Sequence, residues 1–222
     1  GLATPWNPRP NGGVVALAAS GNASYVGGWL NSLRDWVPRS GLAALDVTTG
    51  AATPWDPGCD GLVRSLAASG STVYVAGQFS TVGGKARANL AALDATDGTA
   101  RDWSPNPNGP LWTVVVSGST VYAGGWFGRI AGQPRGYAAA LDSATGAATA
   151  WDPGANDIVN TLAVSGGTVY AGGWFSRIGG QQRRSIAALD AATGAATSWN
   201  PDGDGVVQAL AVGGSTVYAG GI

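Results

Sequence analysis

The sequence has no histidine, no glutamate and no methionine, and it has one cysteine and one lysine. With no histidine, and with Cys59 as the single thiol, the chain lacks the residues for a catalytic triad, a histidine-based metal site or an intrachain disulfide. Cys59 is interpreted as a small loop residue rather than a reactive thiol. No run of 18 apolar residues is present, so the sequence predicts no insertion into a membrane.

Charge is also scarce. Charged residues make up 11% of the chain and the formal net charge is −1, so the basic stripe that would attract nucleic acid is missing. The helix formers glutamate, lysine and methionine are absent or nearly so, whereas glycine occurs 37 times and valine, threonine and tryptophan are common. A hydrophobic content of 45% is enough for a large core. This composition predicts a folded protein of strands and turns.

The dominant positive feature is a repeat. A Trp-x-Pro element recurs at intervals of 49, 48, 48 and 48 residues, and a tyrosine keeps the same interval. A fixed period in the 40s is typical of a repeat architecture. The tryptophans are Trp6, Trp55, Trp103, Trp151 and Trp199, and the tyrosines are Tyr25, Tyr74, Tyr122, Tyr170 and Tyr218.

Each repeat predicts four short strands. A tight turn joins the first two, a longer loop leads to the third, and the fourth runs into Trp-x-Pro, whose proline cannot donate to a sheet ladder. The segment from Asp46 to Gly50 and its copies predict a hairpin turn, because aspartate binds downstream amides and glycine adopts positive φ. The predicted first strands are 14–20, 63–69, 111–117, 159–165 and 207–213, the second 72–78, 120–126, 168–174 and 216–221, and the third 42–46, 89–94, 137–142 and 186–190.

Four antiparallel strands in each 48 residues predict the blade of a β-propeller, with a β-solenoid as the alternative. The positions that the two chain ends occupy within the repeat predict five blades, with the last blade closed by strands from both termini. Because the chain starts in mid-repeat, processing, cropping and a longer array with more blades stay open. We expect one all-β domain over 1–222, with units at 7–55, 56–103, 104–151, 152–199, and 200–222 plus 1–6.

The repeat resembles a known type. The fourth unit reads Trp151-Asp152-Pro153, then Val169-Tyr170-Ala171-Gly172-Gly173-Trp174-Phe175, Gly179-Gly180, Arg183 and Ala187-Ala188-Leu189-Asp190. These motifs resemble the delta-60 type repeat of bacterial surface and secreted β-propellers. The Ala-Leu-Asp-x-x-Thr-Gly stretch is similar to the quinoprotein-type propeller repeat. The resemblance covers essentially the whole chain, and it implies a bacterial protein located outside the cell or on its surface.

Four arginines each precede an aspartate by seven residues. A planar guanidinium can hold a carboxylate through two hydrogen bonds, and a group needed in every blade is more easily structural than ligand-binding. We therefore predict structural ion pairs within or between blades. The pairs are Arg39 with Asp46, Arg87 with Asp94, Arg135 with Asp142, and Arg183 with Asp190.

One position of the first strand varies while its neighbours do not. In a propeller this innermost strand lines the axis, so equivalent residues of successive blades converge there. A guanidinium, an indole and two amides predict a small polar site with an aromatic floor, suited to sugars or peptides, unless the position has merely drifted. The first blade has Val15 here, and the candidate ligand-binding residues are Arg64, Trp112, Asn160 and Gln208.

A second candidate set follows the second strand. A tryptophan repeated at this place, with an arginine three residues beyond it in two blades, suits stacking on carbohydrate rings or contact with a protein. The alternative is that these tryptophans cover blade edges. The set is Trp29, Trp126 and Trp174, with Arg129 and Arg177, and Gln78 interrupts it.

No metal or cofactor is predicted. Asp202 and Asp204 flank a glycine, but two carboxylates fall far short of a calcium shell. Aspartate pairs can catalyse glycoside hydrolysis, yet most aspartates lie in the repeated turns, so we predict no enzyme activity. The acidic metal ligands and vicinal cysteines of a quinoprotein site are also missing. The sequence predicts a non-catalytic extracellular propeller that binds other protein subunits, with a lectin binding surface glycans and a quinoprotein-like scaffold as alternatives.

Overall fold

The computed structural model describes residues 6–222 and confirms an all-β architecture. Within these residues the single helical element is the short 3-10 turn η1 (Arg34–Trp36), and no helix is long and apolar enough to cross a membrane. The chain forms two compact units, one ending at Ser104 and the other spanning Pro105–Ile222. The predicted outer strand at residues 1–6 lies outside the described residues except for Trp6.

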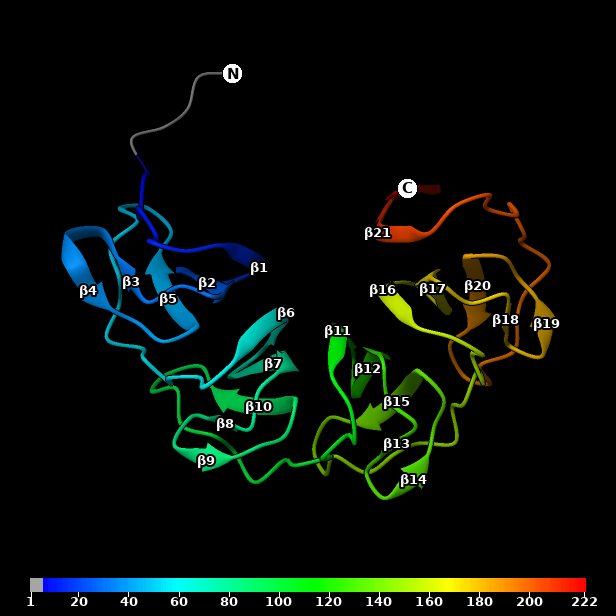
Figure 1. Cartoon of the computed structure of the whole chain (residues 1–222), viewed down its shortest axis with the longest axis horizontal. Coiled ribbons are helices and arrows are strands. Elements are labelled where there is room, and N and C mark those ends of the chain that lie inside the picture. Colours follow the sequence, from blue (N-terminus) through cyan, green and yellow to red (C-terminus); the bar gives the residue numbers. More distant parts are fainter. Residues whose placement is uncertain (1–5) are drawn as a thin grey trace. The chain divides into compact units, whose positions relative to one another are not determined.

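The first unit contains two antiparallel sheets, blade one and blade two, each with three strands (Figure 1). In both sheets the second strand lies in the middle, hydrogen-bonded to the first and the third. Blade one consists of β1 (Val14–Ser20), β2 (Ala23–Gly28) and β5 (Leu42–Asp46), and blade two of β6 (Leu62–Ser69), β7 (Thr72–Gln78) and β10 (Leu90–Asp94).

The second unit repeats this pattern in blades three and four and adds a strand pair, blade five. The predicted first, second and third strands are confirmed to within one residue at each end. Blade three consists of β11 (Leu111–Ser117), β12 (Thr120–Gly125) and β15 (Ala138–Asp142), blade four of β16 (Val159–Ser165), β17 (Thr168–Gly173) and β20 (Ile186–Asp190), and blade five of β21 (Val207–Gly213) and β22 (Thr216–Gly221).

The expected fourth strand is short. It pairs with the third strand through one residue, as between Leu45 and Ala52 or between Leu189 and Ala196, and then leaves for Trp-x-Pro. The turn before it forms as predicted. In blade one the Asp46 carboxylate accepts hydrogen bonds from the Thr48 and Thr49 amides at 3.0 and 2.7 Å, and Gly50 has a φ of 72°.

The loop between the second and third strands contains a feature that the sequence analysis missed. In blades one to four it folds into a two-stranded ribbon of two residues per strand, because a tight turn there lets the loop pair with itself. The ribbons are β3 (Ser32–Leu33) with β4 (Val37–Pro38), β8 (Thr81–Val82) with β9 (Lys85–Ala86), β13 (Arg129–Ile130) with β14 (Gln133–Pro134), and β18 (Arg177–Ile178) with β19 (Gln181–Gln182).

The hydrophobic core lies between neighbouring sheets of a unit, where the tryptophans of Trp-x-Pro act as wedges. Trp151 packs edge-on against Tyr122 of blade three, with ring centroids 5.2 Å apart. Its indole N–H donates to the Asp190 carbonyl of blade four at 3.0 Å. Trp55 joins blades one and two in the same way. The recurring tryptophan thus packs between two sheets, and burying one indole stabilises by up to about 5 kcal/mol.

A glycine on the second strand lets the next sheet approach closely. A Cβ added at Gly172 would lie 2.5 Å from Cγ1 of Val207, which belongs to blade five. Gly220 occupies the same repeat position in β22, and a Cβ added there would meet nothing within 4 Å.

We therefore expect Gly172→Ala to lower the free energy of unfolding by about 1–3 kcal/mol through overpacking. Gly220→Ala, its matched control, should change it by about 0.5 kcal/mol or less. Urea denaturation of the two variants and the parent protein measures both values. Equal effects of the two substitutions would contradict this packing.

Candidate functional site

Three exposed tryptophans stand at the end of the second strand. Trp29 and Trp126 are each 59% exposed and Trp174 is 54% exposed. The next residue in each blade points the opposite way and is buried, as with Phe127 at 3% and Phe175 at 1%. This residue anchors the loop in the core, so the indole before it is held outward. The structure thus places the predicted tryptophan set on the surface.

An asparagine or aspartate holds each of these loops. The side-chain oxygen of Asn108 accepts hydrogen bonds from the Gly128 and Arg129 amides, both at 2.9 Å. The same bond pair forms in blades one to four, with partners 20 and 21 residues further along the chain. We call this pair of hydrogen bonds the staple. The sequence analysis did not predict it, although its side chains recur at the interval of the tryptophans: Asn11, Asp60, Asn108 and Asn156.

The staple of blade two carries a negative charge. Partial burial raises the pKa of Asp60, but hydrogen bonds from the Ser80 hydroxyl and from the Thr81 and Ser80 amides outweigh burial, and the pKa falls to about 2. The carboxylate is therefore ionised at neutral pH. In blade four, Asn156 makes the same amide contacts and donates to the Ser176 hydroxyl at 2.9 Å.

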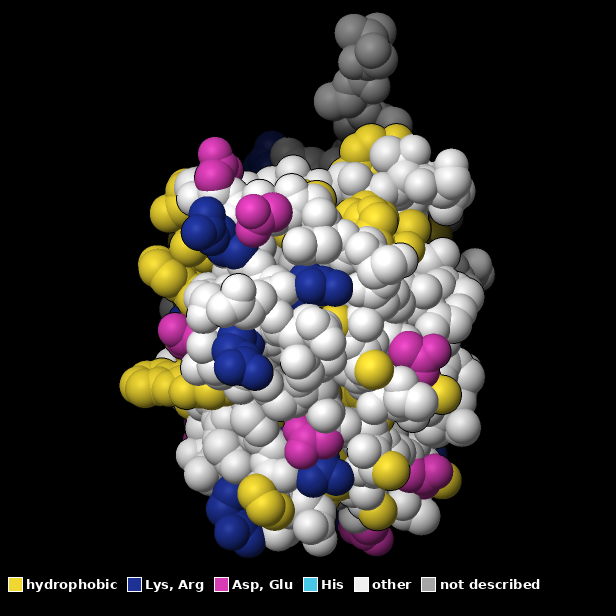
Figure 2. Space-filling view, turned by 90° about the vertical axis from the view of Figure 1, so that its right-hand side faces the viewer, with side chains coloured by type: hydrophobic (Ala, Val, Ile, Leu, Met, Phe, Trp, Pro, Cys, Tyr) yellow, Lys and Arg dark blue, Asp and Glu magenta, His cyan; other side chains and the backbone are white. Residues whose placement is uncertain are grey.

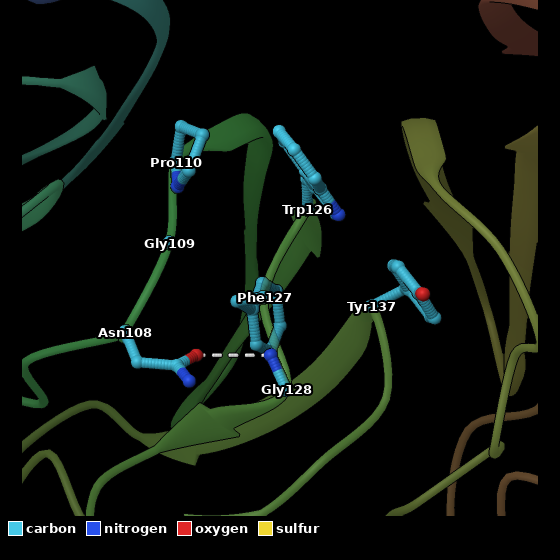
Figure 3. Close-up of a pocket in the computed structure, with 7 residues that line it drawn as sticks. All are labelled: Asn108, Gly109, Pro110, Trp126, Phe127, Gly128 and Tyr137. Atoms are coloured by element: carbon cyan, nitrogen blue, oxygen red, sulfur yellow. Dashed lines mark hydrogen bonds between the residues drawn. The ribbon is translucent and has the colours of Figure 1, made fainter.

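A hollow of about 340 Å³ opens beside Trp126 in blade three. Pro110, Trp126 and Tyr137 surround it, and the Asn108 staple joins the loop at its base (Figure 3). None of its lining residues is charged. Flat apolar walls with one carboxamide nearby suit a neutral ligand that has a ring or proline face.

Tyr137 is held in an unfavourable backbone conformation at this hollow. Its φ is 62°, in the left-handed region that bulky residues rarely adopt. The equivalent residues of the other blades are small or readily left-handed: Gly41, Asn89 and Ser185. A bulky residue kept there at a cost of about 1 kcal/mol or more points to a use for its side chain.

The variable position of the first strand coincides with a β-bulge. In blade three the pairing register shifts between Leu111 and Thr113, so Trp112 is the extra residue, and the same shift occurs in all five first strands. A bulge redirects a side chain and is common beside binding sites. Asn160 donates to the Val207 carbonyl of the next blade at 3.1 Å. Convergence of Arg64, Trp112, Asn160 and Gln208 at one axis stays a prediction.

The predicted ion pairs between an arginine and the aspartate seven residues later do not form among the described residues, because both side chains have other partners. Arg39 precedes strand β5 (Leu42–Asp46) and Asp46 ends it, and five residues of strand span about 16 Å, so the two side chains lie near opposite ends of the strand. Each aspartate accepts from its own turn, and Asp94 also pairs with Arg101 at 2.8 Å. Each arginine donates to a backbone carbonyl 14 residues further on: Arg39 to Thr53, Arg87 to Arg101, Arg135 to Thr149 and Arg183 to Thr197.

The remaining candidate groups are the Cys59 thiol and the carboxylates of Asp202 and Asp204. Burial raises the pKa of the Cys59 thiol to about 11, so it stays protonated at neutral pH. Among residues 6–222 no group of three or more metal-binding side chains lies close enough to hold a metal ion. Asp202 and Asp204 therefore belong to no such group. On the face drawn in Figure 2, acidic and basic side chains are scattered without a continuous area of one sign.

No protein-family model matches the sequence, and no curated protein matches it. Solved structures resemble it in fold. The computationally designed Ika4 protein aligns with 85% of this chain and 99% of its own at 16% identity and a TM-score of 0.58. BamB from Moraxella catarrhalis aligns with 82% of this chain and 51% of its own at 23% identity and a TM-score of 0.51.

A chain of the mitotic checkpoint complex aligns with 89% of this chain and 53% of its own, at 15% identity and a TM-score of 0.63. This chain thus spans about half the length of that protein and of BamB. Identities this low show the fold alone. Together with the repeated sheets they show a β-propeller rather than a solenoid. The five-blade count, the single domain and closure of the last blade stay predictions.

The lowered pKa of Asp60 provides a test of the staple in blade two. Its pKa is about 2 in the folded chain and about 3.9 in an unfolded one. A lowered pKa gives stability that is present above about pH 4 and is lost as the pH falls towards 2. We expect Asp60→Asn, which keeps an acceptor oxygen, to remove this part of the pH dependence. Urea unfolding at pH 4 and at pH 2 measures it.

The reverse substitution is the matched control. Asn156→Asp beside Ser176 recreates the blade-two staple in blade four, so it should add pH dependence over the same range. If Asp60→Asn kept the pH dependence of the parent protein, the carboxylate would not be held as described.

Proposed function

We propose that this β-propeller is a non-catalytic binding module that engages a protein partner through the exposed tryptophans of its second unit, Trp126 and Trp174. The observation that supports this most is their exposure of 59% and 54% at equivalent positions of adjacent blades, although each follows a strand locked in its sheet. Rigid, exposed tryptophans are favoured as anchors of protein interfaces because they bury much area and lose little entropy.

The backbone around these indoles is preorganised. The Trp126 amide donates to the Pro110 carbonyl at 2.9 Å, and the Trp174 amide donates to the Ile158 carbonyl at 2.9 Å. The staples of Asn108 and Asn156 fix the residues that follow. Binding therefore orders few groups, which lowers the entropic cost of association.

A carbohydrate ligand is the second candidate, and the hollow of blade three favours it. Trp126 and Tyr137 offer ring faces there, with Asn108 beside them (Figure 3). Aromatic faces pack against the apolar face of a sugar ring, and an uncharged lining suits a neutral glycan. The quinoprotein-like scaffold has no comparable observation in its favour.

The absence of catalysis is part of the proposal. Hydrogen bonds from the following threonines lower the pKa of Asp46, Asp142 and Asp190, so these carboxylates are ionised and occupied in turns. They are poorly suited to exchange protons near neutral pH. A position outside a bacterial cell or on its surface rests on the repeat resemblance, and we keep it within this proposal.

The test compares the double variant Trp126→Ala/Trp174→Ala with Val47→Ala, which removes an exposed apolar side chain from a turn. Proteins that the immobilised parent chain captures from the medium and surface extract of its source organism are purified, and their affinities are measured by calorimetry. The double variant should bind at least about 30-fold more weakly, and Val47→Ala should bind like the parent.

The same proteins are applied to a glycan array. Tryptophan-dependent binding to neutral glycans, without a protein partner, would establish the second candidate in place of the first. A partner that binds the double variant as tightly as the parent would contradict the proposed surface.

A further inference from the structure

Blade four departs from the other blades in how its repeated arginine is neutralised. Arg39 lies 3.5 Å from the Asp56 carboxylate, and Arg135 lies 3.7 Å from that of Asp152. Both aspartates are the middle residue of Trp-x-Pro. In blade four that residue is Asn200, and within residues 6–222 no carboxylate forms an ion pair with Arg183.

The guanidinium of Arg183 is nevertheless held in place. It donates to the Gln182 carbonyl at 2.7 Å and to the Thr197 carbonyl at 2.6 Å. Its counterparts Arg39 and Arg135 make the same two kinds of bond. The replacement of aspartate by asparagine therefore changes the charge next to Arg183 while the carbonyl anchors stay in place.

A second departure adds positive charge at the same place. Arg184 follows Arg183, whereas the equivalent residues of the other blades are Ser40, Ala88 and Gly136. Arg177 lies across the loop on β18, the strand that pairs with β19. No hydrogen bond or ion pair of the Arg177 or Arg184 side chain is found among the residues that the structure describes.

The three arginines line one hollow of about 410 Å³, together with Ser176, Gln182, Asn200 and Asp202. Three arginines and one aspartate line it, in a chain whose formal net charge is −1. Guanidinium groups match the oxygens of carboxylate, sulfate and phosphate groups in geometry as well as in charge. The carboxamides of Gln182 and Asn200 supply neutral donors.

We infer that this hollow is an anion-binding site that takes one oxyanion group, a carboxylate, sulfate or phosphate. It shares no residue with the tryptophan pair proposed above, Trp126 and Trp174, although Arg177 follows Trp174 by three residues. In blades one and three the aspartate of Trp-x-Pro partly fills this role from within the chain. In blade four an external oxyanion replaces that aspartate.

The test titrates the whole protein with sodium sulfate, sodium phosphate and sodium glucuronate at low ionic strength, following backbone amide NMR shifts. Saturable shifts centred on 176–184 and 200–202 are expected for at least one anion, and the best anion identifies the group. Affinity should fall as sodium chloride is added, because exposed charges are screened.

Four variants locate the site. Asn200→Asp introduces the aspartate of blades one and three and should weaken binding at least tenfold. Arg184→Gly introduces the blade-three residue and should weaken it similarly, whereas Asp202→Asn removes the opposing charge and should tighten it. Arg129→Ala, at the blade-three position equivalent to Arg177, is the matched control and should bind like the parent.

Trp126→Ala/Trp174→Ala should bind the anion normally, so failure of the tryptophan surface would leave this result standing. The inference would be overturned by an absence of saturable shifts with all three anions. It would also be overturned if Asn200→Asp and Arg184→Gly bound the anion as tightly as the parent, or if Arg129→Ala lost as much affinity as they do.

Discussion

The tryptophan of Trp-x-Pro is the contact on which the blade packing depends. It meets the tyrosine of one sheet edge-on and donates to the carbonyl that ends the third strand of the next sheet, as Trp151 does between Tyr122 and Asp190. One side chain thus fixes both the spacing and the orientation of two sheets. Trp55 makes the same contacts in the first unit, so the recurrence of this tryptophan at intervals of 48 or 49 residues has a structural reason.

Because the sheets approach closely, the residues proposed to bind a partner are those that face away from the buried tryptophan. The chain turns outward where the second strand ends, so one tryptophan projects into solvent while the next residue anchors the loop. The staple and the arginine–carbonyl bonds then hold the loop that follows. The proposed binding groups are therefore carried by a rigid frame, and differences between blades would change ligand chemistry without changing the fold.

The sequence predicted the features that recur and are local. Strand periodicity located β1, β11, β16 and β21 to the residue, and the aspartate turn followed from the behaviour of Asp46 and its copies. It failed where a partner is distant or is a backbone atom. The acceptor of Arg39 is a carbonyl, which every residue has, so no side-chain pattern could reveal it. The staple of Asn108 likewise binds amides 20 residues away.

In the candidate sites too, the sequence indicated features that recur along the chain but not those that depend on backbone conformation or on distant partners. The recurrence of Trp126 marked it as a candidate, with covering of a blade edge as the alternative, but the role proposed for Tyr137 depends on a left-handed φ that spacing cannot report. The varying position of the first strand follows from the alignment of the repeats, whereas the bulge at that position depends on pairing with β12. Arg183 and Asn200 line one hollow of blade four, a proximity that their separation in the sequence does not report.

The most direct measurement compares two tryptophans of the second unit that differ in burial, Trp151 at 2% exposed and Trp174 at 54%. Trp151→Ala should lower the free energy of unfolding by about 3–5 kcal/mol, and Trp174→Ala should change it by about 0.5 kcal/mol or less. Similar losses for both variants, or a larger loss for Trp174→Ala, would contradict the claim that the recurring wedge holds the blades together.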